Sequence, residues 1–483
     1  MDILTRVTES FNTVQFKRIF LDRLNELISP VLFNPSALFY GEFIESLGMY
    51  GYCLIKDAIV YSLETMDKLF YDKPGRTSRY YCKSYRKREI ITVFGHIIFK
   101  RHEYVDRLSN KPFIYVDESI GLRRKDRYDP CVCAKIYERY GYINSMPKAG
   151  KDIGNEIFSP FTLNIDNFLL SIPRQTIWKI LHRFKQIDVK LESKDTPSTL
   201  YVMADEKYIA SQNNDLVNLM VKEVIVHEGL NTHSTVNNET GEVYIRNKLI
   251  NPRRFINHNE DIYTKVMDYI TKTYDTDKIK HIYLMGDGGS WIKDGLYTLD
   301  GYPYKLDYGL DKFHYCLAIN TISKDDNLKS KLYSYSIGND TKSFNTLIKY
   351  IKQIDPSRSD IITEKAKYIK SNFKAIKTMY KHIKIGCAME QAISHDLSSQ
   401  YSSVPKAYSK KWLPYYLNIR ENYLNGYNLK KLYLMALDKA KDKHQTIIKL
   451  TPKLDLSIFD NRIKDETYSI AKKANLAYIR SNS

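Results

Sequence analysis

Apolar residues in the first part of the chain recur at steps of three and four, which is the spacing of one face of an α-helix. The clearest positions are Phe43, Ile44, Leu47, Tyr50, Ile55, Ile59, Leu63 and Met66. Pro74 and Gly75 end the pattern, because neither residue favours a continuing helix. We therefore expect an N-terminal helical region over residues 1–75.

The next region, residues 76–118, contains two short apolar runs, Ile90–Phe94 and Ile97–Phe99, which flank Gly95-His96 and predict a β-hairpin. Glu89 is the only acid between residues 76 and 102. The basic residues that we propose for DNA binding are Arg79, Lys83, Arg86, Lys87, Arg88, Lys100 and Arg101. Tyrosines interleave with them, as suits contact with phosphates. The alternative is a solvent-exposed edge strand whose cations prevent pairing with another chain.

Residues 119–187 return to helical spacing and resemble a helix-turn-helix. An apolar segment at 168–170 and a break at 171–173 precede a helix from Arg174 to Phe184. Its apolar residues would face the core, while its outward side would carry Arg174, Gln175, Lys179 and Arg183. A recognition helix needs this division in order to enter a major groove. An ordinary pair of helices is the alternative, and the polar residues 186–198 predict a linker.

The remainder predicts an α/β region over residues 199–430. Strands are expected at Leu200–Asp205, Val221–Val226 and Glu242–Arg246, followed by an amphipathic helix, a strand at Ile282–Met285 and another around Tyr304–Leu306. Three strands, a helix, and then alternating strand and helix is the order of the ribonuclease H-like fold. That fold has a mixed sheet whose first three strands form an antiparallel meander. A helical insertion is expected over about residues 321–384, and a basic tail over 431–483.

In that fold the first and fourth strands are neighbours, so Asp205 and Asp287 would meet where their strands end. An ordinary Asp-Gly turn is the alternative for Asp287, which lies between glycines. A later helix has an apolar stripe through Met389 and Ile393, and Glu390 at the edge of this stripe could lean over the sheet. Glu364 is the alternative third acid.

Two aspartates and a glutamate would form a site of hard oxygen ligands, which suits Mg²⁺ or Mn²⁺. Two such ions, roughly 3.5–4 Å apart, can activate a water or a 3′-hydroxyl for phosphoryl transfer. Lys293 and His314 are candidates for contact with the scissile phosphate, although a surface histidine on a helix is the alternative for His314.

Composition adds a charge argument. The formal net charge is +18, from 74 Lys and Arg against 56 Asp and Glu, and this favours a polyanionic partner. An AT-rich genome, which enriches Lys without a function, is the alternative. The lack of a long apolar run and of a signal-peptide pattern predicts a cytoplasmic, nucleoid-associated protein without a membrane partner.

Several motifs carry a family resemblance. They are Ala204-Asp205-Glu206, residues 284–293 around Asp287, residues 310–314 and residues 386–390 around Glu390. These resemble the motifs of ISLre-type insertion-sequence transposases, over about residues 40–430. The resemblance implies a DDE-type transposase in which Asp205, Asp287 and Glu390 bind the metals. Its partner would be double-stranded DNA, both the terminal inverted repeats and the target, and it would act as a homo-oligomer.

Two alternatives remain open at this point. One is a domesticated, non-catalytic DNA-binding protein. The other is a ribonuclease H-like nuclease or resolvase that cuts branched DNA without joining strands.

Overall fold

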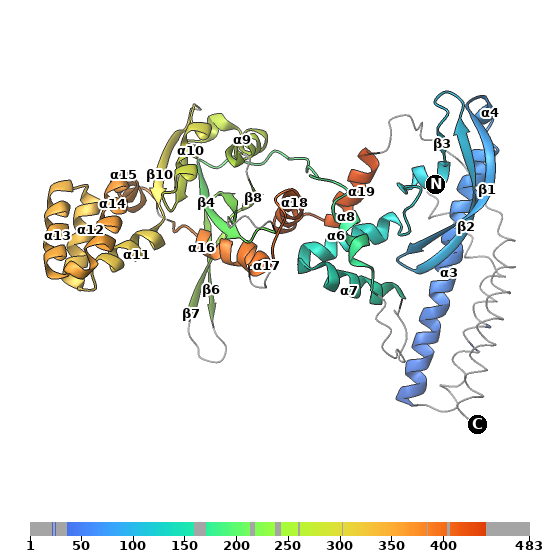
Figure 1. Ribbon diagram of the computed structural model, residues 1–483, viewed down its shortest axis with the longest axis horizontal. Coiled ribbons are helices and arrows are strands. Elements are labelled where there is room, and N and C mark those ends of the chain that lie inside the picture. Colours follow the sequence, from blue (N-terminus) through green and yellow to red (C-terminus); the bar gives the residue numbers. More distant parts are fainter. Residues whose placement is uncertain are drawn as a thin grey trace. The chain divides into compact units, whose positions relative to one another are not determined.

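The computed structural model describes residues 22, 25, 36–158, 171–212, 218–236, 243–258, 261–301, 303–383, 385–402 and 406–440 (Figure 1). The chain divides into two compact units. Residues 181–432 form what we call the sheet unit, and residues 1–180 with 433–483 form the hairpin unit.

The hairpin unit combines a long helix with an antiparallel sheet. The sheet has the order β1-β2-β3, with β1 at Tyr80–Thr92, β2 at Gly95–Asp106 and β3 at Pro112–Phe113. The helices are α3 (Ala37–Tyr71), α4 (Arg76–Arg79), α5 (Tyr115–Ser119), α6 (Pro130–Ile143) and α7 (Met146–Phe158). Helices α8 (Arg174–Leu181) and α19 (Leu429–Lys439) cross the unit boundaries. The hairpin is confirmed, and so is a helix over Ala37–Tyr71 of the predicted N-terminal region. Apart from residues 22 and 25, the first 35 residues lie outside the described part of the chain, as do residues 441–483 of the predicted basic tail.

The turn of the hairpin differs from the predicted one. Thr92 pairs with Gly95, so the loop is Val93-Phe94 and not Gly95-His96. The Thr92 hydroxyl accepts a hydrogen bond from the Phe94 amide (3.1 Å) and donates one to the Gly95 carbonyl (3.0 Å). Gly95 has a backbone φ of 96°, which residues other than glycine rarely adopt. The glycine therefore closes the turn and does not form its tip.

The predicted helix-turn-helix is only partly described. Its first element falls largely on residues 159–170, which lie outside the described residues. Its second element is present as α8, but this helix ends at Leu181 and not at Phe184. Arg174, Gln175 and Lys179 are exposed while Ile177 is buried, as predicted. Arg183 lies beyond the helix, with its guanidinium 5.9 Å from the Phe184 ring.

The sheet unit is built on a five-stranded mixed sheet of order β10-β9-β4-β5-β8. The strands are β4 (Thr199–Ile209), β5 (Leu219–His227), β8 (Arg253–Asn257), β9 (His281–Gly286) and β10 (Lys305–Leu310). Strands β4, β9 and β10 are parallel, and β5 is antiparallel to both of its neighbours. The predicted pairing of the first and fourth strands is therefore confirmed.

Two strand predictions were wrong in position. Strand β7 (Val243–Leu249) covers the predicted third strand, but it pairs with β6 (Leu230–Val236) in a separate hairpin. The third strand of the main sheet is β8, whose two arginines hide its apolar alternation in the sequence. Strand β4 also continues past Asp205 to Ile209, because its pairing with β5 extends that far.

Helices cover both faces of the sheet. One face packs on α9 (Ile262–Thr273) and α10 (Ser290–Leu299), with Leu200, Val202 and Ala204 in the shared core. The other face contacts α16 (Met389–Ala392), a π-helix at Ile393–Ser398 and α18 (Leu413–Leu424). Short elements at Thr276–Lys278, Pro356–Arg358 and α17 (Ser399–Tyr401) complete the fold.

The predicted helical insertion is present beyond β10. It follows α11 (Lys312–Ile322) and consists of α12 (Asp326–Gly338), α13 (Thr341–Ile354), α14 (Ser359–Ser371) and α15 (Phe373–Lys381). The apolar residues between positions 362 and 383 have helical spacing, but the helix is broken at Asn372, between α14 and α15. The side-chain nitrogen Nδ2 of Asn372 donates a hydrogen bond to the Tyr368 carbonyl at 2.8 Å. Such a local bond from a side chain to the backbone competes with continuation of the helix.

No helix in the described part of the chain is long and apolar enough to cross a membrane.

Gly295 permits the contact between α9 and α10. A Cβ at this position would lie 2.5 Å from the Tyr263 ring, which is buried. We predict that Gly295→Ala lowers the free energy of unfolding by about 1–3 kcal/mol through overpacking, as measured by urea denaturation. Gly338→Ala is the matched control, because a Cβ there meets no atom within 4 Å. An equal effect of both substitutions would contradict this packing argument.

Candidate functional site

Asp205 and Asp287 come together at the end of a parallel strand pair. Strands β4 and β9 pair as far as Met203 and Met285, and each aspartate lies two residues further along its chain. Gly286 allows this close approach, since a Cβ there would lie 2.9 Å from the Ala204 carbonyl. Asp287 then turns away from the strand and accepts a hydrogen bond from the Gly289 amide at 2.9 Å. The structure thus joins two of the predicted acids.

The two carboxylates influence each other. Burial, as the largest cause, and the negative charges of Asp287 and Glu206 together raise the pKa of Asp205 to about 6, against the lowering effect of a hydrogen bond from the Glu206 amide. Burial and like charge both penalise the ionised form. A cation placed between the acids would relieve both penalties, and so the site favours a positively charged ligand.

The end of the adjacent parallel strand adds a third acid, Asp311, which the sequence analysis did not single out. Asp311 follows β10 as Asp287 follows β9, and its amide donates to the Gly286 carbonyl at 2.7 Å. Its carboxylate caps α11 at the Phe313 amide (3.1 Å) and lies 2.9 Å from Nδ1 of His314. Asp307 and Gly309 interrupt the apolar pattern before it, so the sequence offers no local signal for this acid.

His314 belongs to this cluster. Its hydrogen bond to Asp311 raises its pKa, and the negative charges of Asp311, Asp287 and Asp205 add to the effect despite partial burial. His314 therefore lies beside the acids, and its contact with a phosphate stays a prediction. Burial also raises the pKa of the Cys387 thiol, with added effect from the same three acids, which places this side chain nearby.

Lys293 lies close to the same strand end. Its ammonium is 6.0 Å from the centre of the Tyr308 ring, and the Tyr308 hydroxyl donates to the Gly286 carbonyl at 3.1 Å. On the opposite side of β4, Trp291 donates to Glu206 at 2.6 Å and ties the start of α10 to this strand. These contacts fix the loop that carries Asp287.

Glu390 does not join the two aspartates. It is exposed at the start of α16, and among the described residues its carboxylate makes no hydrogen bond or ion pair. Its helix nevertheless packs on β4, where the Ala388 amide lies 3.3 Å from the Met203 sulfur. The alternative acid, Glu364, is exposed on α14 and pairs with Lys365 at 2.7 Å. Across the described ranges, no three His, Cys, Asp or Glu side chains are placed to hold a metal ion.

A buried charge network holds the π-helix on the sheet beside Asp205. Glu223, the cross-strand partner of Asp205, is fully buried, and burial with the nearby Asp396 charge raises its pKa well above the ordinary value. Arg254 binds Asp396 at 2.6 Å and lies 3.9 Å from Glu223. Arg420 donates to the main-chain carbonyls of Asp396 (3.0 Å) and His395 (3.1 Å). This network was not visible in the sequence.

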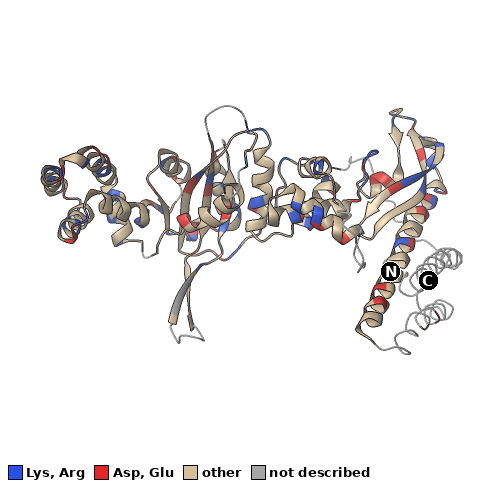
Figure 2. Ribbon diagram, turned by 60° about the horizontal axis from the view of Figure 1, so that its bottom comes forward, with Lys and Arg blue, Asp and Glu red and all other residues tan. Residues whose placement is uncertain are grey.

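The predicted basic residues of the hairpin divide into two groups. Lys83, Arg86, Lys87 and Lys100 are exposed. Figure 2 marks the positions of Lys and Arg along the ribbon in blue. Arg79 pairs with Asp106 at 3.3 Å, and Arg86 lies 3.9 Å from Glu103.

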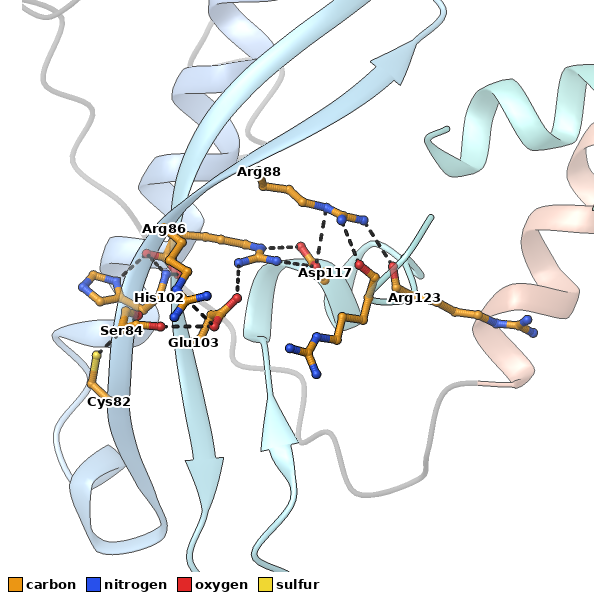
Figure 3. A network of polar contacts seen from close by, with 11 residues as sticks. Cys82, Ser84, Arg86, Arg88, His102, Glu103, Asp117 and Arg123 are labelled. Atoms are coloured by element: carbon orange, nitrogen blue, oxygen red, sulfur yellow. Dashed lines mark hydrogen bonds and ion pairs between the residues drawn. The ribbon is translucent and has the colours of Figure 1, made fainter. Parts of the chain in front are cut away.

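Arg88 points from β1 toward the segment between α5 and α6 (Figure 3). Arg101 is buried and binds Asp117 through two hydrogen bonds of 2.8 and 3.1 Å. The guanidinium groups of Arg88 and Arg101 thus make their contacts within the protein, and DNA binding by the exposed group stays a prediction.

The raised pKa of Asp205 predicts a pH effect. Its folded pKa of about 6 exceeds the ordinary 3.8, so ionisation destabilises the fold as the pH rises through this window. We predict that Asp205→Asn melts a few degrees above the wild type at pH 7.5 and that the difference disappears near pH 4. Mg²⁺ should raise the melting temperature of the wild type only.

Asp300→Asn, at an exposed acid after α10, is the control for this melting experiment and should follow the wild type at every pH. An Asp205→Asn protein that gains as much stability from Mg²⁺ as the wild type would exclude Asp205 as a metal ligand.

Residues 41–436 match the family UPF0236, described as an uncharacterised protein family. One UPF0236 protein of Caldanaerobacter subterraneus subsp. tengcongensis is 26% identical over 413 residues, which is 82% of this chain and 80% of the relative. A UPF0236 protein in the vanSb 3′ region of Streptococcus gallolyticus is 26% identical over 235 residues, 47% of each chain. The family match spans most of the sequence, and the chain therefore belongs to UPF0236.

Proposed function

We propose that this protein is a DNA transposase with a ribonuclease H-like catalytic core. Asp205 and Asp287 would hold divalent metal ions, and the hairpin unit would bind the ends of the mobile element. The observation that carries the proposal is the parallel pairing of β4 with β9, which brings together two acids from distant parts of the sequence. The ISLre-type resemblance noted in the sequence concerns these same residues.

The strand order supports the proposed fold. Taken in chain order, the main-sheet strands are β4, β5, β8, β9 and β10. The first three form an antiparallel meander, the fourth lies beside the first, and the fifth extends the sheet in parallel. This is the arrangement expected of a ribonuclease H-like core. Fold alone does not determine chemistry, so the acids must carry the functional argument.

The donor set fits Mg²⁺ or Mn²⁺, because both ions prefer carboxylate, water and phosphate oxygens. Bound there, the ions would activate a water or a 3′-hydroxyl and stabilise the leaving oxygen. Asp205 and Asp287 would be ligands, and Glu390 would reach them through a shift of α16, whose fourth residue leads directly into a π-helix. Asp311 would orient His314 through Nδ1, which leaves Nε2 to contact a phosphate.

The relatives supply a second kind of support. The name of one Caldanaerobacter relative joins eleven locus designations, and the name of another joins four. Many copies of one gene in one genome are what a self-copying element would produce. A housekeeping enzyme gives no reason to expect such a number.

A non-catalytic DNA-binding protein is the second candidate. The exposed position of Glu390, away from the two aspartates, favours it. A nuclease or resolvase that does not join strands is the third. Titration of Mn²⁺ against DNA cleavage separates the second candidate from the others, and a strand-transfer product on a gel separates the transposase from the nuclease.

We predict that Asp287→Asn loses metal-dependent nicking while it still binds DNA. Removal of a residue that hydrogen-bonds to a metal ligand lowers metal affinity or activity by about 10–100-fold. Removal of the ligand itself should therefore reduce the rate of nicking by about 100-fold or more. The measurement is nicking of a supercoiled plasmid that carries the DNA flanking the gene, with Mg²⁺ or Mn²⁺. Asp300→Asn is the control, and persistent cleavage by Asp287→Asn would count against the assignment.

The identity of the third acid has its own test. We predict that Glu390→Gln loses nicking as Asp287→Asn does, whereas Glu364→Gln keeps nearly full activity because Glu364 is already paired with Lys365. Both substitutions remove one exposed negative charge from a helix, so each is the control for the other. The reverse result would assign the third position to Glu364.

A further inference from the structure

The loop between α5 and α6 carries a concentrated positive charge. Four of the five residues from Arg123 to Arg127 are cations, and all four side chains are exposed. The remaining residue, Asp126, uses its carboxylate within the loop, where it accepts a hydrogen bond from the Arg123 amide at 2.9 Å. None of the four cations pairs with an acid in the described chain.

The loop is fixed to the hairpin by main-chain bonds. The Ile91 amide donates to the Arg127 carbonyl at 2.7 Å, and the Asp129 amide donates to the Ile91 carbonyl at 2.9 Å. Tyr128 forms a parallel bridge with Ile91, so the end of the loop extends the edge of the hairpin sheet. The loop therefore has a defined position beside β1.

Arg88 holds this loop through its guanidinium group (Figure 3). Its guanidinium donates to the carbonyls of Arg124 (2.9 Å), Arg123 (3.2 Å) and Asp126 (2.5 Å). Asp117, which is buried, lies 3.8 Å from the Arg88 Nε and balances its charge. Only a planar group with several donors can reach three carbonyls in this way.

The loop and the exposed face of the hairpin share a concave surface. Arg124 lines a cavity of about 260 Å³ together with Lys83 and Tyr81 of β1. Glu103 also lines it, and its carboxylate accepts hydrogen bonds from Ser84 (3.1 Å) and Arg101 (3.3 Å). Two cations beside a tyrosine ring suit a sugar-phosphate backbone, which offers charge and apolar contact along its length. A membrane surface would not need a concave site.

We propose that the Arg123–Arg127 loop is a contact element for the DNA phosphate backbone and that Arg88 is its positioning residue, which does not itself touch DNA. This inference rests on the proposed function for the identity of the partner. It adds residues that the sequence analysis did not assign, and it changes the role of Arg88 from contact to support.

The test uses the full-length protein and fluorescence anisotropy with a duplex oligonucleotide across a range of KCl concentrations. The first variant replaces Arg123, Arg124, Lys125 and Arg127 by Gln. Each lost phosphate contact should reduce the salt slope by about 0.9. We expect weaker binding and a slope reduced by about 3–4.

A charge-matched control replaces four exposed lysines of the helical insertion, Lys342, Lys349, Lys367 and Lys374, by Gln. It removes the same net charge and should change the slope much less. An equal effect of the two quadruple variants, or an unchanged slope in the loop variant, would overturn the proposal.

The Arg88→Lys substitution distinguishes a role in holding the loop from a direct contact with DNA. Lysine keeps the positive charge but cannot donate to all three loop carbonyls. We expect a several-fold loss of affinity in the wild-type background and no further loss in the loop variant. An additional loss there would show that Arg88 contacts DNA directly and would overturn its positioning role. Because the loop residues are exposed, their variant tests the contact even if Arg88→Lys fails to fold.

The outcomes separate this inference from the proposed function. If the wild type does not nick DNA but the loop variant still loses affinity, the contact stands and the transposase assignment falls. If the wild type nicks DNA and the loop variant binds normally, the contact falls alone. Binding of the wild type to anionic lipid vesicles and not to duplex DNA would overturn the inference.

Discussion

The parallel register between β4 and β9 is the constraint on which the candidate site depends. Leu200, Val202 and Ala204 alternate into the core under α9 and α10, and so their neighbours must face the other way. A slip by one residue would place Asp205 in the apolar core, where an unpaired carboxylate is costly. The packing of the hydrophobic face thus fixes the position of the acid on the opposite face.

The opposite face must then be covered without excluding the acids from solvent or ligand. The structure meets this need with a charged contact: Arg254 bridges the fully buried Glu223 and the π-helix residue Asp396. A buried carboxylate is tolerated when it is paired or protonated, and removal of one partner is strongly destabilising. Since α16 leads directly into this π-helix, the network also limits how far Glu390 can move relative to Asp205.

The sequence predicted this sheet face well where a strand ended in an acid, because a short apolar run gives a local signal. It failed where the signal was not local. Strand β8 begins with two arginines, so its apolar alternation was too short to see, and Asp311 lay behind a glycine-containing run. Arg86 and Arg88 look alike in the sequence, and only the distant Asp117 makes one of them structural. Glu390 was placed on the correct helix, but no sequence pattern could give its distance from Asp205.

The same distinction decides what the net charge of the chain means. The net charge of +18 already subtracts every acid, and it does not say which cations face solvent. Asp117 forms ion pairs with Arg101 and Arg88, and Asp106 forms one with Arg79. The cations that could release counterions from DNA are those without an acid in reach, and in the described hairpin unit they include Lys83, Lys87 and the Arg123–Arg127 loop. Acids buried among the inward arginines therefore help to define the basic surface, since they decide which positive charges remain for a polyanion.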